Sequence, residues 1–103
     1  MSEVVEMPVA CSLHEAALIE RRNTVLRTIG HNVQAVRELT DGYAFQFSSD
    51  DACLEQLMRV IQLERRCCPF LTFQLRVEAG IGSLWFEITG PSTAKDFIKV
   101  LFD

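Results

Sequence analysis

The junction near Pro69 constrains the fold of this chain more than any other stretch of the sequence. Residues 51–67 carry apolar side chains at helical spacing, which predicts a buried stripe formed by Leu54, Leu57, Met58 and Ile61. Because proline disfavours helical dihedral angles at the residue before it, the helix should end at Cys68. Residues 70–78 then alternate apolar and polar side chains, which is typical of a strand. The sequence therefore predicts a sharp corner between a long helix and a buried strand.

The remaining segments predict two β-hairpins and two further helices. We expect helices over residues 13–29 and 93–102, and strands over 33–39, 43–48, 70–78 and 83–89. Asp41 and Gly42 form the first turn, where glycine would supply a positive φ. The order α-β-β-α-β-β-α predicts an α+β fold, a four-stranded antiparallel sheet with helices packed on one face. At this length, residues 1–103 should form a single domain.

Composition and charge argue against several classes of function. The chain has 10 Lys and Arg against 14 Asp and Glu, for a net charge of −4, and no basic stripe, so we expect no nucleic-acid partner. It shows no signal-peptide pattern and no apolar run of about 20 residues, so we expect a cytoplasmic protein with no membrane partner. In that reducing compartment, the four cysteines should be thiols, metal ligands or transient redox groups.

Helix geometry separates the cysteines into groups. Cys53 and Cys67 should lie about 20 Å apart along one helix, at about 1.5 Å per residue, so Cys53 is expected to be a packing residue. Glu64 shares a helix face with Cys67 and Cys68. The two thiols converge only if the helix end relaxes, because adjacent helix residues diverge by about 100°, and Pro69 gives a reason for that relaxation.

These residues form a candidate site for a soft metal ion. Cys11 lies before the first helix, in a loop that could bring it to Cys67 and Cys68. Three thiolates suit a soft metal or metalloid, and with one more ligand they suit Zn²⁺. We therefore predict Cys11, Cys67, Cys68 and Glu64 as metal ligands. His14 has a Cys-x-x-His spacing from Cys11, which is a weak signal on its own, and a solvent-exposed histidine in the first helical turn is the better interpretation.

Two simpler explanations compete with the metal site. Cys67 and Cys68 could be packing residues at a buried corner, because free cysteine is among the most buried residue types. Glu64 could be exposed or form an ion pair with one of four nearby arginines: Arg21, Arg22, Arg65 or Arg66.

Two other classes of function remain as alternatives. The first is a non-catalytic module for dimerisation or small-molecule binding whose cysteines are structural, and such a protein could be a homodimer. Trp85, Phe70 and Tyr43 could form an aromatic patch that serves as its dimer surface or ligand platform, or they could be scattered surface aromatics. The second is a thiol enzyme or redox protein. A helix C-terminus disfavours a thiolate and no histidine is placed to act as a base, so we assign no catalytic residue.

Several segments resemble a family of short, uncharacterised bacterial proteins. The likeness covers most of the chain, and its specific part is the Glu-x-x-Cys-Cys-Pro-Phe run at residues 64–70. Residues 10–13, 41–45 and 89–91 also match. Similar segments occur near or fused to metal-responsive regulators of the MerR type. The resemblance implies a soft-metal role with Cys11, Cys67 and Cys68 at the matching positions. It does not extend to His14, and it supplies no established activity.

Overall fold

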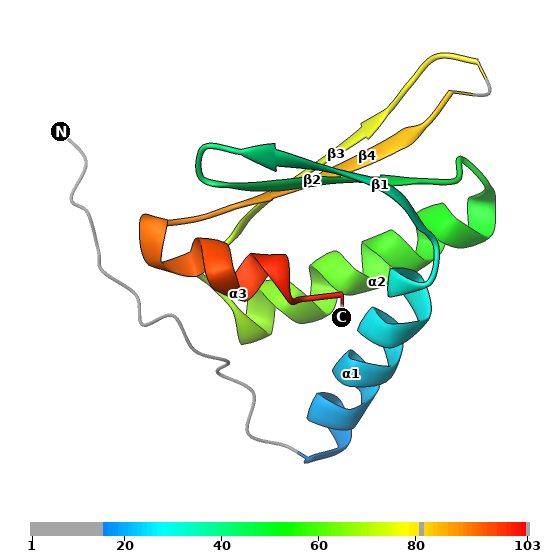
Figure 1. The fold of residues 1–103 in the computed structure, drawn as a ribbon. Helices are drawn as coiled ribbons and strands as arrows, with labels where there is room; N and C mark the ends of the chain where they lie inside the picture. Colours follow the sequence, from blue (N-terminus) through cyan, green and yellow to red (C-terminus); the bar gives the residue numbers. More distant parts are fainter. Residues whose placement is uncertain (1–15, 81, 103) are drawn as a thin grey trace, which may run out of the picture.

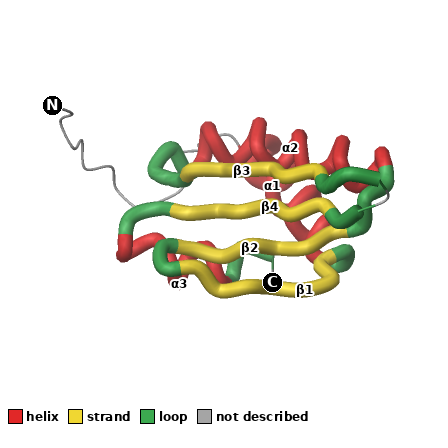
Figure 2. Tube along the Cα trace, turned by 90° about the horizontal axis from the view of Figure 1, so that it is seen from above, coloured by secondary structure: helices red, strands yellow, loops and turns green. Residues whose placement is uncertain are grey.

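The computed structural model describes residues 16–80 and 82–102 and has the predicted α+β architecture. Its elements are α1 (Ala16–Gly30), β1 (Val33–Leu39), β2 (Gly42–Phe47), α2 (Asp51–Cys67), β3 (Thr72–Val77), β4 (Leu84–Thr89), η1 (Ser92–Ala94) and α3 (Lys95–Lys99). The strands form one antiparallel sheet in the order β1-β2-β4-β3. The helices lie on one face of this sheet and leave the other face open (Figures 1 and 2). The predicted fold class is therefore confirmed.

Helix α2 begins and ends as the sequence predicts. The carboxylate of Asp50 accepts a hydrogen bond of 2.7 Å from the backbone N–H of Cys53, which caps the helix at its start. At the other end, the N–H of Cys68 donates to the carbonyl of Glu64 at 2.6 Å. The φ of −127° and ψ of 71° at Cys68 leave the helical region, as expected for the residue before Pro69.

The buried stripe of α2 differs from the predicted one. Its five buried side chains recur at alternating spacings of four and three residues: Cys53, Leu57, Val60, Glu64 and Cys67. Of the four residues predicted for the stripe, only Leu57 is fully buried, and Met58 is 48% exposed. Leu54 and Ile61 are partly buried and pack against the core, so the prediction is confirmed in part and is wrong at Met58. It followed the most apolar residues, whereas the face of α2 that meets the sheet and α1 includes a glutamate and two cysteines.

The first hairpin forms as predicted, but Gly42 is required for a different reason. Among the described residues only Gly80 has a positive φ. A Cβ on Gly42 would lie 1.9 Å from the carbonyl oxygen of Ile88 and 2.8 Å from the Cα of Thr89, both on the neighbouring strand β4. The close approach of β4, and not the turn conformation, therefore excludes a side chain at residue 42.

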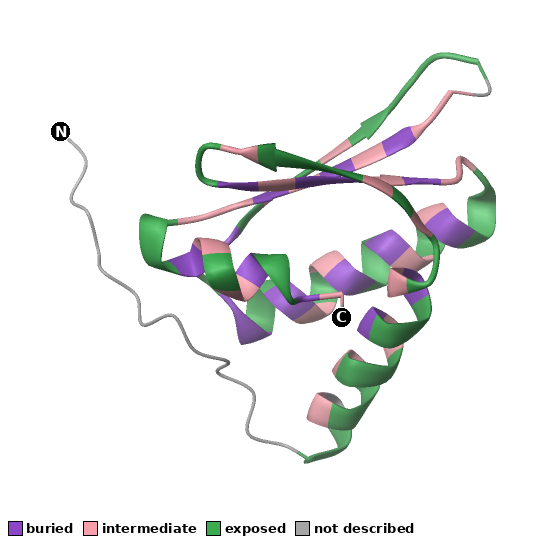
Figure 3. Cartoon of the chain, in the orientation of Figure 1, coloured by how far each residue is buried: buried purple, intermediate pink, exposed green. Residues whose placement is uncertain are grey.

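The core lies between the sheet and the helices (Figure 3). Strands β2 and β4 supply its largest buried side chains, among them Phe47, Leu84, Phe86 and Ile88. The shorter α3 and the 3₁₀ turn before it replace the single helix predicted over 93–102 and close one end of this layer. Ile98 and Leu101 are buried there, and the ring of Phe102 meets Phe45 edge to face at 4.8 Å.

The predicted aromatic patch does not form. Trp85 alternates with the buried Leu84 and Phe86, so its side chain lies on the open face of the sheet, where Arg37 sits 4.7 Å from the ring centroid. Phe70 is buried and packs against Phe97, at 5.8 Å between ring centroids. Tyr43 pairs with Ile88 on the face that the helices cover. The three aromatic residues therefore do not share a surface.

Candidate metal site

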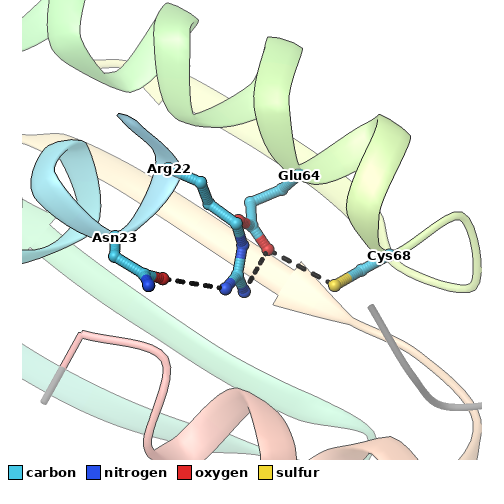
Figure 4. A network of polar contacts seen from close by, with 4 residues as sticks. All are labelled: Arg22, Asn23, Glu64 and Cys68. Carbon is cyan, nitrogen blue, oxygen red and sulfur yellow. Dashed lines mark hydrogen bonds and ion pairs between the residues drawn. The ribbon is translucent and has the colours of Figure 1, made fainter. Parts of the chain in front are cut away.

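A buried ion pair joins α1 to α2 (Figure 4). The guanidinium of Arg22 donates through Nε to Oε1 of Glu64 and through Nη2 to Oε2 at 3.2 Å. The Glu64 side chain is fully buried and that of Arg22 is 13% exposed. Burial lowers the pKa of Arg22, but the hydrogen bond and the charge of Glu64 outweigh burial, so this pKa is raised overall. The Arg22 guanidinium therefore stays positively charged beside Glu64.

Both partners occupy positions that neighbouring residues use for packing. Leu26 follows Arg22 by four residues, and Ile29 follows Leu26 by three residues. The side chains of Leu26 and Ile29 are both buried. Glu64 stands between Val60 and Cys67 in the buried stripe of α2. A buried charge is costly unless it is paired and hydrogen-bonded, so each residue requires the other. This spacing was the signal that could have selected Arg22 from the four candidate arginines.

The Cys68 thiol is tied to the same carboxylate. Its Sγ donates to Oε2 of Glu64 at 3.4 Å, and the residue is completely buried at the corner between α2 and β3. Burial, reinforced by the charge and the hydrogen bond of Glu64, raises the pKa of Cys68 to about 12, although Arg22 acts in the opposite direction. At neutral pH the residue is therefore a protonated thiol and a weak nucleophile.

Glu64, Cys67 and Cys68 form one compact group of potential ligands. Their ligand atoms all lie within 4.8 Å of one another, and all three residues are buried. Cys68 carries a free thiol, whereas Cys67 is disulfide-bonded. Because the thiolate is the form of cysteine that binds metals, both sulfurs are available to a metal only when Cys67 is reduced. Two thiolates and one carboxylate then fit a soft or borderline cation such as Zn²⁺.

The other predicted residues fall outside this group. Cys11 and His14 lie outside the described residues. Cys53 is buried near the start of α2 as a free thiol, in the packing position that helix geometry predicts. His31 is exposed just after α1. The structure thus brings together Glu64, Cys67 and Cys68, while the place of Cys11 in the site stays a prediction.

A groove lies next to the ion pair. It has a volume of about 480 Å³ and runs between α1 and the C-terminal segment. Arg22, Asn23 and Arg27 line it from α1, together with an apolar floor that includes Leu26, Phe97 and Leu101. Arg22 therefore contacts the buried cluster with its guanidinium and borders the groove with the same side chain.

Comparison with known proteins finds no relative of this chain. No protein-family model, no curated protein and no solved structure matches the chain. Among the described helices, none combines the length and the apolar composition needed to cross a membrane. The argument about function therefore rests on the chemistry of the site.

Proposed function

We propose that the reduced protein binds a soft metal ion or metalloid through the thiolates of Cys67 and Cys68, as a sensor, buffer or carrier. The observation that supports this function is the closeness of two cysteines and a carboxylate inside the protein, with all ligand atoms within 4.8 Å. Two Zn–S bonds of about 2.3 Å at a tetrahedral angle place their sulfurs about 3.8 Å apart, which falls within that spread. The site is also at a helix C-terminus, where the helix dipole favours a cation.

Charge balance assigns different roles to the sulfurs and the carboxylate. Arg22 and Glu64 already neutralise each other inside the protein. Two thiolates and one divalent cation are also neutral, so the metal can enter without leaving an unpaired charge in the interior. We therefore propose Cys67 and Cys68 as the primary ligands, with Glu64 orienting Cys68 and becoming a ligand only if Arg22 moves away.

Two further elements of the proposal come from the sequence. Cys11 is proposed as the third thiolate, because it precedes the first helix and lies at a position that matches the resembling bacterial family. The association of similar segments with MerR-type regulators supports a soft metal as the cargo. Nothing in the described chain resembles a separate DNA-reading unit, so a sensor of this kind would act through a partner.

Metal titration of the reduced protein tests this function. With a non-thiol reductant present, we expect Hg²⁺ and Zn²⁺ to bind at one ion per chain, followed through thiolate–metal absorbance in the ultraviolet. Cys67→Ser and Cys68→Ser should each abolish this stoichiometry or weaken binding at least tenfold. Cys53→Ser is the matched control, because Cys53 is buried on the same helix but is not in the cluster. Unchanged binding in both site variants would reject the proposal.

The disulfide at Cys67 supports a second candidate, a thiol redox protein. A disulfide beside the free thiol of Cys68 is the arrangement needed for thiol–disulfide exchange. Against it stands the raised pKa of Cys68, which disfavours attack by that thiol. A redox titration against glutathione decides the matter. A potential near the cytosolic poise, about −220 to −320 mV, supports a redox role, whereas a value far below it indicates a structural disulfide.

The third alternative, a dimerisation or small-molecule-binding module, has less support. Its cysteines would be structural, and the buried thiols of Cys53 and Cys68 are compatible with that role. The aromatic patch that could have served as its binding surface does not exist, because Phe70 is buried and Tyr43 lies on the helix side of the sheet. Trp85 lies half-buried on the open face, next to Arg37. Sedimentation of the reduced protein would measure whether it forms a homodimer.

A further inference from the structure

The groove beside Arg22 is much larger than a bare ion requires. Its volume of about 480 Å³ compares with about 30 Å³ for one water molecule in the liquid. Part of its lining is apolar, from Phe97, Val100 and Leu101, which a hydrated cation would not need. These dimensions and this surface suit a small organic molecule that carries a metal.

The charge of the groove predicts the sign of the charge that such a molecule would carry. Arg27 and the Glu64-paired Arg22 line it, so Arg27 gives the groove its net positive charge, and the described residues contribute no acidic side chain to its lining. A cleft of one charge concentrates ligands of the opposite charge and repels ions of its own sign. A free metal cation would be repelled at this entrance, whereas an anionic metal complex would be attracted.

Arg22 connects the groove with the cluster of cysteines. Its Nη1 donates to Oδ1 of the groove residue Asn23 at 3.3 Å, and its other nitrogens hold Glu64. Glu64 in turn accepts from Cys68, so Arg22 and Glu64 link the groove to the buried thiol through hydrogen bonds. A rotation of this side chain into the groove would expose Glu64 and Cys68 together.

We propose that the metal arrives in this groove as an anionic thiolate complex and reaches Cys67 and Cys68 when Arg22 swings aside. The inference rests on the proposed function. The exchange is balanced: each protein thiol forms a new sulfur–metal bond, one bond from the metal to a carrier thiolate breaks, and the proton of the protein thiol leaves with the released carrier. Neither the metal nor the sulfur changes oxidation state in these steps.

Transfer kinetics test the groove. Reduced protein is mixed with Hg²⁺ bound to mercaptosuccinate, a carboxylated thiol, or with Hg²⁺ bound to uncharged 2-mercaptoethanol, and the rise of protein-bound metal is followed. Arg27→Glu should slow transfer from the anionic complex about tenfold and leave transfer from the uncharged complex nearly unchanged. Arg21→Glu is the matched control, because Arg21 is exposed on the same helix but does not line the groove.

Equal slowing by Arg27→Glu and Arg21→Glu, or equal effects on both complexes, would overturn the groove proposal while leaving metal binding intact. Failure of the unsubstituted protein to take metal from either complex would instead reject the proposed function and this inference with it. Arg22→Lys keeps the charge but loses the two-point contact, so it should accelerate transfer from both complexes. An unchanged rate in this variant would show that Arg22 does not control entry.

Discussion

Arg22 on α1 and Glu64 on α2 form a two-point ion pair at positions where both helices otherwise bury apolar side chains. This pair fixes α1 against the corner that carries Cys67 and Cys68. The carboxylate of Glu64 accepts hydrogen bonds from Arg22 on one side and from Cys68 on the other. It therefore links the stability of the helix packing to the geometry of the thiol pair.

Removing one partner of this pair should destabilise the protein strongly. We expect Arg22→Met to lower the free energy of unfolding by about 3–5 kcal/mol, because it leaves Glu64 buried without a counter-charge. The double variant Arg22→Met/Glu64→Leu should recover much of this loss, since it removes both charges. Urea unfolding of Arg22→Met, Glu64→Leu and the double variant measures the coupling, and a double variant no more stable than Arg22→Met would contradict it.

The ion pair between Lys95 and Glu38 serves as the control for that experiment. Its nitrogen and oxygen lie 2.6 Å apart, but the Glu38 side chain is 68% exposed. Ion pairs between solvent-exposed side chains contribute little to stability, so Lys95→Met should change the unfolding free energy only slightly. A loss as large as that of Arg22→Met would show that burial is not what distinguishes the two pairs.

The thiol of Cys68 should react slowly with alkylating agents in the folded protein. A rise of its pKa from the ordinary 9.0 to about 12 lowers the thiolate population at pH 8 by a factor of about a thousand, and burial hinders access further. Mass spectrometry after timed treatment with iodoacetamide measures the rate for each cysteine. The urea-unfolded protein provides the reference, where Cys68 should react at the rate of a model thiol. Equally fast labelling in both states would favour the thiol-enzyme alternative.

Stability should fall in alkaline solution because of the same thiol. A group whose pKa is higher in the folded than in the unfolded state binds more protons when folded, so its contribution is complete below about pH 9 and is lost as the pH rises towards 12. Cys68→Ala should flatten the fall in unfolding free energy between pH 8 and pH 10.5. Cys53 contributes in the same direction, because burial and then Asp50 raise its pKa. If the unfolding free energy of Cys68→Ala fell with pH as steeply as that of the unsubstituted protein, groups other than Cys68 would cause the loss of stability at alkaline pH.

The local pattern of the sequence was sufficient for the fold but not for the site. The helix over 51–67, the strand over 33–39 and the corner at Pro69 could be predicted because capping, alternation and proline act on neighbouring residues. The link between Arg22 and Glu64 spans two elements, and the sequence offered four arginines without ranking them. Both residues nevertheless follow the four-and-three spacing of their buried stripes, and this pattern would have placed them inside.

The errors have the same origin in tertiary packing. Met58 is apolar and fits a helical period, yet it is exposed because the sheet and α1 cover a different face of α2. Gly42 sits beside a turn, but the neighbouring strand β4 determines why it must be glycine. The local sequence does not predict which face of a helix other elements will cover. It also does not predict how closely a distant strand will approach.

Metal binding should also stabilise the reduced protein, which separates a built site from two accidental thiols. A ligand that binds only the folded state adds about 2.7 kcal/mol when its concentration is 100 times the dissociation constant. We therefore expect Zn²⁺ to raise the thermal midpoint of the reduced protein, and Cys68→Ser to remove most of this shift. Cys53→Ser should keep it, because Cys53 is not in the cluster. An unchanged midpoint despite bound metal would mean that the unfolded chain binds Zn²⁺ as well as the folded protein does. In that case the corner between α2 and β3 would not preorganise the two thiols for metal binding.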